Sequence, residues 1–170
     1  MAVDPHSHNQ IVMGEIHAMI HAGKFFTVCH YDAAVVDDGD IEVIISAGAK
    51  SVHCRHTFAA GGDAVCALFE QTVTSADGTA LTPHNRKRID PASPVASFFH
   101  TPTITGDGVQ LGQNFMPGGT GGNFSAGGQA AGFEEWILAP NTKYLYRLTN
   151  VAGTTQPLGM ILDFYEASPG

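Results

Sequence analysis

The stretch from Gly132 to Ala167, GFEEWILAPNTKYLYRLTNVAGTTQPLGMILDFYEA, decides the fold. Apolar and polar residues alternate in three successive runs within it, at 134–138, 143–150 and 158–166. A proline followed by an asparagine separates the first two runs, and this pair favours a tight turn because proline presets φ and asparagine can cap a turn. Alternation with a period of two is typical of half-buried antiparallel strands. The stretch therefore predicts three β-strands connected by turns.

Apolar residues occupy both faces of the last two predicted strands. Tyr144, Tyr146 and Leu148 share one face of the run 143–150, and the opposite face would be polar if it met water. That opposite face nevertheless carries apolar residues, so we expect it to be covered. We predict that it contacts a neighbouring subunit; the alternative is that the chain's own loops cover it. The candidate interface residues on these strands are Leu145, Arg147, Ile161, Asp163 and Tyr165.

The rest of the chain continues the pattern of short strands. Ile11–His21 fits either a helix or a strand, and we predict a strand that forms a hairpin with Phe25–Tyr31. Further strands are predicted at Ile41–Ala47, Val52–Phe58, Ala64–Thr74, Val95–Thr105 (broken by Pro102) and Val109–Met116. Closely spaced strands without a clear crossover helix predict an all-β, antiparallel, jelly-roll-like β-sandwich. An immunoglobulin-like sandwich is the alternative, but its Cys…Trp…Cys spacing is missing because Trp136 follows all three cysteines.

The predicted organisation is one domain with an extended arm. Residues 1–15 are read as an N-terminal arm, in which Ile11 and Val12 are further candidates for the subunit interface. Residues 16–170 form the sandwich domain, with a flexible glycine-rich loop at 117–132. The polar connection 80–94 is expected to carry the chain from one sheet to the other.

Charge and hydropathy argue against two classes of partner. The formal net charge is −8, from 16 acidic and 8 basic residues, whereas sequence-independent nucleic-acid binding depends on neutralising phosphates. The one basic cluster, Arg86-Lys87-Arg88, is expected to be a solvated loop. No run approaches the roughly 18 apolar residues of a membrane-spanning helix, and the N-terminus lacks the pattern of a secretory signal. We therefore expect neither nucleic acid nor a membrane as partner.

The candidate reactive side chains form no catalytic pattern. Cys29, Cys54 and Cys66 lie in apolar runs and are expected to be buried free thiols, which suits a reducing cytoplasm. His17 and His21 are the best pair for a metal, but no further ligand has matching spacing. The cupin pattern of metal-binding histidines is missing, as are a nucleophile motif and a phosphate-binding loop. We therefore expect a protein that is not an enzyme and that has no cofactor or metal.

Several segments together resemble a group of tailed-bacteriophage virion proteins. They include IHAMIHAGKFFTVCHYD (16–32), IEVIISAG (41–48), LFEQTV (68–73), GTALTPHNRKR (78–88), HTPTIT (100–105), EEWILAPNTKYLYRLTN (134–150) and LDFYE (162–166). The resemblance covers about Ile16 to Glu166. It implies a capsid decoration (cement) protein or another head-associated structural subunit, often a trimeric jelly roll. The implied partners are the major capsid protein and further copies of this chain in a homotrimer, on the capsid surface of a virion made in the host cytoplasm.

A second functional class is a receptor- or carbohydrate-binding module of a tail or fibre. Such a module needs an exposed aromatic platform, because sugar rings stack on aromatic side chains. The candidates for this platform are Trp136, Phe124 and Tyr144. The alternation places Trp136 on the same face as Leu138, which weakens this hypothesis.

Overall fold

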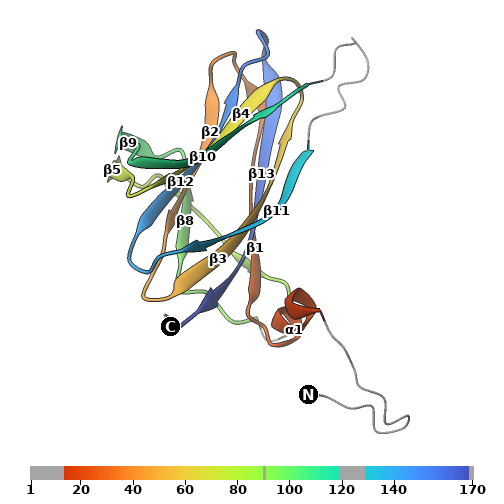
Figure 1. Ribbon diagram of the computed structural model, residues 1–170, viewed down its shortest axis with the longest axis vertical. Helices are drawn as coiled ribbons and strands as arrows, with labels where there is room; N and C mark the ends of the chain where they lie inside the picture. The colour runs from red at the N-terminus through yellow and green to blue at the C-terminus, as the bar shows by residue number, and fades with distance from the viewer. Residues whose placement is uncertain (1–13, 90, 119–128, 169–170) are drawn as a thin grey trace, which may run out of the picture.

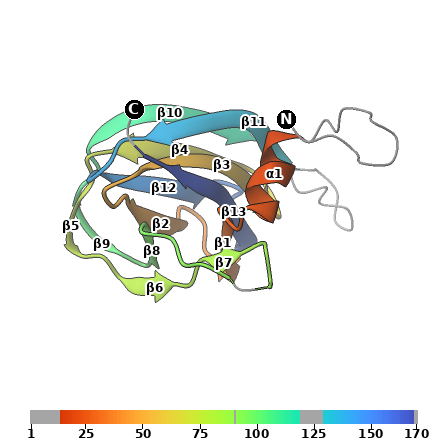
Figure 2. The same cartoon turned by 90° about the horizontal axis from the view of Figure 1, so that it is seen from below.

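Two antiparallel sheets pack face to face in a β-sandwich, with one short helix at the end where the chain enters the fold (Figures 1 and 2). The computed structural model describes residues 14–89, 91–118 and 129–168. The helix is α1 (Glu15–His21). The long strands are β1 (Phe25–Val35), β2 (Asp40–Ser46), β3 (Ser51–Ala60), β4 (Ala64–Glu70), β10 (Val109–Met116), β11 (Gln129–Leu138), β12 (Lys143–Asn150) and β13 (Gln156–Ala167). The short strands are β5 (Val73–Ala76), β6 (Thr79–Leu81), β7 (His84–Asn85), β8 (Ser97–His100) and β9 (Thr103–Gly106).

The long strands pair in a nested order. β1 pairs with β13, β2 with β12, β3 with β11 and β4 with β10, each pair being antiparallel. One sheet has the order β11-β3-β13-β1-β7 and the other the order β10-β4-β12-β2-β8-β6. The all-β antiparallel sandwich predicted from the sequence is confirmed.

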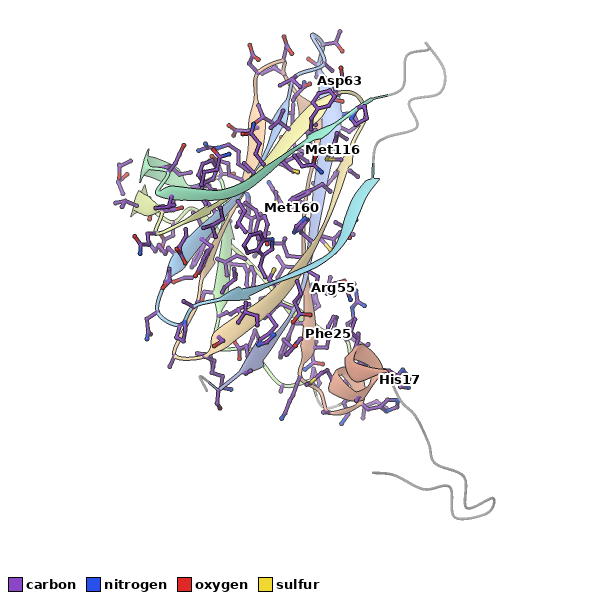
Figure 3. All side chains as sticks on the ribbon, in the orientation of Figure 1. His17, Phe25, Arg55, Asp63, Met116 and Met160 are labelled. Carbon is purple, nitrogen blue, oxygen red and sulfur yellow. The ribbon has the colours of Figure 1, made fainter. Side chains whose placement is uncertain are left out.

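The C-terminal stretch forms three strands as predicted, but they are not neighbours in one sheet. β11 and β13 belong to the five-stranded sheet, and β12 belongs to the six-stranded sheet. The predicted inward faces are correct: Tyr144, Tyr146 and Leu148 on β12 are buried in the main core. Met160 (Figure 3), Leu162 and Phe164 on β13 belong to the same core and come from the opposite sheet.

A helix replaces the first predicted strand. The hairpin prediction for Ile11–His21 is wrong, because α1 occupies Glu15–His21 and only residues from 14 onward are described. Gly23, at φ 69, ends the helix: its amide donates to Ile20 O, and the next amide, of Lys24, donates to Met19 O. This C-terminal motif depends on a left-handed residue, which glycine adopts at no steric cost. The turn glycine that we read as a hairpin signal is therefore a helix cap.

Two predicted strands are each divided by a residue with positive φ. Gln71, at φ 60, separates β4 from β5 inside the predicted strand Ala64–Thr74. Thr101, at φ 53, separates β8 from β9 at the break that Pro102 had indicated. Beyond these bends β5 and β9 pair with each other and form a separate two-stranded ribbon, which projects beside β12 in Figure 1.

The connection at 80–94 reaches the five-stranded sheet but does not transfer the chain to it, because β6 before it and β8 after it both belong to the six-stranded sheet. The prediction that this connection carries the chain from one sheet to the other is therefore wrong. β6 pairs with β8 in the six-stranded sheet, and β7 pairs with β1 in the five-stranded sheet. The glycine-rich segment is shorter than predicted at its C-terminal side, because β11 already begins at Gln129; residues 119–128 lie outside the described part of the chain. Among the described residues, no helix is long and apolar enough to cross a membrane.

Candidate functional site

The outer face of β12 holds the ribbon β5–β9 against the six-stranded sheet. Three of its outward side chains, those of Lys143, Leu145 and Arg147, contact the ribbon or the residues next to it. Lys143 forms an ion pair with Asp77, just beyond β5. Leu145 packs with Ile44 and Phe69 in a second apolar cluster, against which Ile104 of β9 lies. The ribbon is therefore fixed by an ion pair on one side and by apolar burial at its centre.

Arg147 fixes the other side of the ribbon. Its Nη1 and Nη2 donate to the two carboxylate oxygens of Asp107, at 2.9 and 2.8 Å, and its Nε donates to Glu42 at 2.6 Å. The hydrogen bonds with Arg147 lower the pKa of Asp107 below its usual value. Burial raises the pKa of Glu42, although the hydrogen bond from Arg147 opposes this effect. The Arg147 guanidinium also lies 5.3 Å from the ring centre of Phe69. Charge pairing and cation–π contact thus act together here.

On β12, the chain's own ribbon covers the outer face that we expected to be covered. Leu145 is fully buried beneath the ribbon, and Arg147 is engaged with Asp107 and Glu42. For these two residues the alternative explanation is correct: the chain itself covers this face. They also lie on a different sheet from Ile161, Asp163 and Tyr165, so the expectation that all five share one face is wrong.

The outer face of the five-stranded sheet has two distinct halves. The strand register places side chains in rows across β1, β13 and β3. The first two rows are Phe25–Tyr165–His53 and Thr27–Asp163–Arg55. The next two are Cys29–Ile161–Thr57 and Tyr31–Gly159–Ala59. The first two rows are aromatic and charged, and the next two are small or apolar.

In the charged half, Tyr165 and Asp163 are already paired within the chain. Tyr165 is only 8% exposed: its ring stacks on His53 at 4.4 Å between centres, and its hydroxyl donates to Glu135. Asp163 accepts hydrogen bonds from Thr27 at 2.6 Å and from Arg86 at 2.7 Å. An ion pair between Asp163 and an arginine of a neighbouring subunit would have to break these bonds.

The basic cluster is only in part the solvated loop that we expected. Arg86 forms an ion pair with Asp163, and its guanidinium lies 5.1 Å from the ring centre of Phe25. Lys87 and Arg88 are exposed. The cluster therefore contains one residue that joins the 84–88 segment to the sheet.

The apolar half is exposed, and we call Cys29, Tyr31, Ala59, Gly159 and Ile161 the β1–β13 patch. Tyr31 is 65% exposed and Ile161 40% exposed. A Cβ on Gly159 would lie 3.5 Å from the Tyr31 ring, an ordinary contact distance, so the ring lies beside this glycine. Among the predicted interface residues, only Ile161 is an exposed apolar side chain in the described part of the chain; Ile11 and Val12 lie outside it. Sequence reasoning missed Cys29 and Tyr31, although their alternation in FFTVCHY places them on one face.

The cysteines do not share one environment. Cys54 and Cys66 are buried as predicted, but Cys29 is exposed on the patch, so the prediction is wrong for this residue. Burial raises the pKa of Cys54 to about 12. Burial, followed by the charge of Asp163, also raises the pKa of Cys29. All three are free thiols.

The histidine pair on α1 does come together. The Nε2 atoms of His17 and His21 lie 3.0 Å apart, and both side chains are exposed at the helical end of the molecule (Figure 3). In the described ranges, no group of three or more histidine, cysteine or acidic side chains is arranged to hold a metal ion. His53 and His56 point to opposite faces of β3: His53 stacks on Tyr165, and His56 lies near Phe58 and Tyr146 between the sheets.

The predicted aromatic platform does not form from the described residues. Tyr144 is buried, and its hydroxyl donates to Glu70. Trp136 is half-buried and lines a cavity between the sheets. Phe124 lies outside the described residues.

Comparison with known proteins yields no relative: no protein-family model, no curated protein and no solved structure matches this chain.

Proposed function

We propose that the protein is a non-enzymatic structural component of a bacteriophage virion, a decoration (cement) protein that binds the outside of the capsid as a homotrimer. The observation that carries the proposal is the β1–β13 patch. Exposed apolar surface that is bordered by polar residues is typical of protein–protein contact. The segments that resemble tailed-bacteriophage virion proteins supply the class of partner.

The strand order supports a jelly-roll description. The first long strand pairs with the last, the second with the last but one, and so on to β4 and β10. A jelly roll is a double-sheet fold of eight strands, and this nested pairing is what one long rolled hairpin produces. Such a scaffold suits a cement protein because a packed β-sandwich presents a rigid surface for contact.

The patch is suited to contact because the acidic side chain beside it is already engaged within the chain. Asp163, in the row next to Ile161, forms an ion pair with Arg86. A partner that covers Ile161 and Tyr31 would therefore bury apolar surface without needing to neutralise this carboxylate. The candidate partners are the major capsid protein and a second copy of the chain.

The thiol of Cys29 provides a direct test. Cys29 lies in the patch beside Ile161, and it is the exposed cysteine of the three. We expect a maleimide to label Cys29 in the dilute protein, and we expect assembly on capsids that lack their decoration protein to protect it. Co-sedimentation would measure binding to the capsids, and light scattering would measure the mass of the free protein.

Matched variants complete the test. Ile161→Ser in the patch should weaken assembly, whereas Val73→Ser, at a residue that is 58% exposed on β5, should leave it unchanged. A protein that stays monomeric and does not bind capsids contradicts the proposal. Equal behaviour of the two variants moves the contact to another surface.

A further inference from the structure

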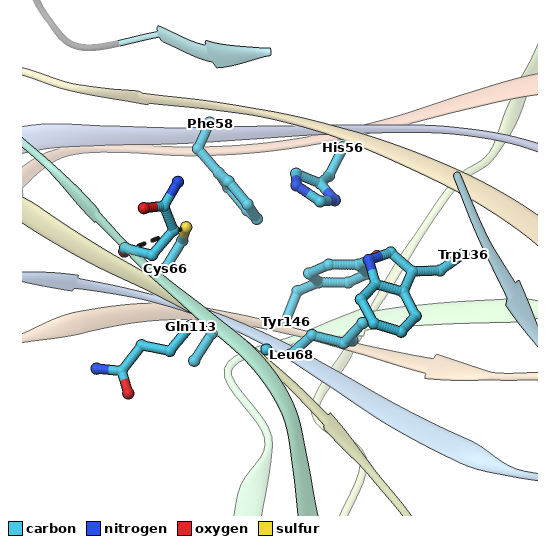
Figure 4. Close-up of a pocket in the computed structure, with 10 residues that line it drawn as sticks. His56, Phe58, Cys66, Leu68, Gln113, Trp136 and Tyr146 are labelled. Atoms are coloured by element: carbon cyan, nitrogen blue, oxygen red, sulfur yellow. Dashed lines mark hydrogen bonds between the residues drawn. The ribbon is translucent and has the colours of Figure 1, made fainter. Parts of the chain in front are cut away.

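A cavity of about 290 Å³ opens between the two sheets, beside the edge strands β10 and β11 (Figure 4). Its walls come from both sheets and include His56, Phe58, Leu68, Gly112, Trp136 and Tyr146. The cavity lies apart from the β1–β13 patch, because its residues point inward and those of the patch point outward. It therefore has no part in the function proposed above.

The cavity exists because a glycine occupies an inward position on β10. Gly112 lies opposite Leu68 of β4, where a side chain would point between the sheets. A Cβ at Gly112 would meet only Trp136 Cζ2, at 3.8 Å, which is an ordinary contact distance. The backbone here does not need glycine's freedom, since Gly112 has no positive φ. Glycine in a strand interior costs stability and often marks a site that a ligand approaches closely. At this position it leaves a space between the sheets that a larger side chain would fill.

Flat rings form much of the wall. The rings of His56 and Phe58 stack at 4.8 Å between centres, and that of Tyr146 lies 5.5 Å from His56 and 6.0 Å from Phe58. Trp136 and Leu68 lie across the space from His56 and Phe58 (Figure 4). Aromatic rings prefer offset or tilted contact with another ring, so these walls favour a flat guest.

Among the described side chains that line the cavity, none is acidic or basic except His56. Burial raises the pKa of Cys66 and of Tyr146, so both remain uncharged in the neutral range. A charged guest would lose its hydration without gaining a counter-ion, which is costly. The volume is at the lower end of the roughly 300–1,000 Å³ that is typical of small-molecule sites.

We propose that this cavity binds a small, flat, uncharged aromatic molecule of one or two rings. The guest would lie between the His56–Phe58 side and the Trp136–Leu68 side, and Gly112 would set the depth of the site. This is a second binding site of the protein, and it does not depend on capsid attachment.

Trp136 is the natural reporter, since the chain has a single tryptophan. The probe is 2-naphthol, and the measurement is the shift of the one indole N–H signal in a proton–nitrogen correlation spectrum. Two analogues test the chemistry: decahydro-2-naphthol keeps the hydroxyl but is not flat, and naphthalene-2-sulfonate keeps the rings but is charged. We expect saturable binding of 2-naphthol and at least about ten-fold weaker binding of both analogues.

Two glycine variants test the location. Gly112→Val should fill the cavity and weaken 2-naphthol binding at least about ten-fold. Gly106→Val on β9 is the matched control, since a Cβ there meets only the Val73 side chain, at 3.9 Å. The control should bind as the wild type does. Thermal unfolding would show that both variants are folded.

Three results would overturn the proposal. One is the absence of a saturable Trp136 shift up to the solubility limit of 2-naphthol. Another is equal affinity of folded Gly112→Val and the wild type. The third is binding of either analogue as tight as that of 2-naphthol. The analogue series uses the wild-type protein, so the test stands even if Gly112→Val fails to fold.

Discussion

Nη2 of Arg86 lies 2.7 Å from both carboxylate oxygens of Asp163 and joins the 84–88 segment to the outer face of the five-stranded sheet. Thr27 completes the arrangement: its hydroxyl donates to Asp163 at 2.6 Å and accepts from Arg86 Nε at 2.8 Å. Each of the three side chains therefore contacts the other two.

Arg86→Leu should lower the free energy of unfolding by about 1 kcal/mol, because it removes a partly exposed ion pair together with a cation–π contact. The Arg86 side chain is 41% exposed, so solvent screening limits the effect. Urea denaturation is the measurement. Arg88→Leu is the control, since Arg88 makes only a 3.4 Å contact with the carbonyl of Asn85. Equal losses in the two variants would show that the geometry around Asp163 contributes nothing specific.

Leu145→Ala should destabilise the fold by about 2–5 kcal/mol, since it opens a cavity beneath the ribbon β5–β9. Leu145 is fully buried with Ile44 and Phe69. Ile161→Ala, at a residue that is 40% exposed, should cost less than about 1 kcal/mol. Thermal or urea unfolding compares the two. A larger loss at Ile161 would contradict the assignment of Leu145 to the core and of Ile161 to the surface.

Acidification should destabilise the protein through His30. Burial, and then the neighbouring His100, lower the pKa of His30 from 6.5. The folded state thus favours the neutral ring, so this contribution to stability is present above pH 6.5 and is lost as the pH falls through the folded-state pKa. Asp32 opposes the shift and reduces its size.

The measurement is the free energy of unfolding at several pH values between about 7.5 and 5. The difference between the wild type and His30→Gln should shrink as the pH falls. His84→Gln is the control, at an exposed residue of β7. A difference at position 30 that stays constant with pH would contradict the prediction.

Only one thiol should react in the folded protein. Cys29 is exposed, whereas Cys54 and Cys66 are buried. Because burial raises the pKa of Cys54 to about 12, its reactive thiolate is scarce at pH 8. A colorimetric thiol reagent should modify one cysteine per chain at pH 8, and all three after denaturation. Cys29→Ser should abolish the native reaction, and residual reaction of that variant would contradict the burial of the other two.

The sequence predicts the positions of individual strands well, but it predicts poorly which strands pair with each other. The alternation in 143–150 identifies which side chains of β12 face the core, because the strand period is two. It does not show that β12 and β13 lie in different sheets, since that depends on pairing with β2 and β4 far away in the chain. The interface prediction failed for Leu145 because the alternation marks an apolar outer residue but not what covers it.

The sequence reveals the two bends only in part. Gln71 and Thr101 adopt positive φ, which non-glycine residues rarely do; Pro102 marks the bend at Thr101, whereas no local signal marks the bend at Gln71. Gly23 has an ambiguous signal, because a glycine after an apolar run indicates a helix end as well as a hairpin turn. The cavity was not predictable either, since Gly112 lies opposite Leu68 only in the folded register.

The ribbon β5–β9 also makes the two outer faces of the sandwich different. Lys143 and Arg147, the outward residues that flank Leu145 on β12, both form ion pairs that hold the ribbon. The centre of this sheet's outer face is therefore covered by the chain itself, while the β1–β13 patch on the opposite sheet is exposed. Attachment through the patch, as proposed above, would turn the ribbon side of every bound copy toward solvent.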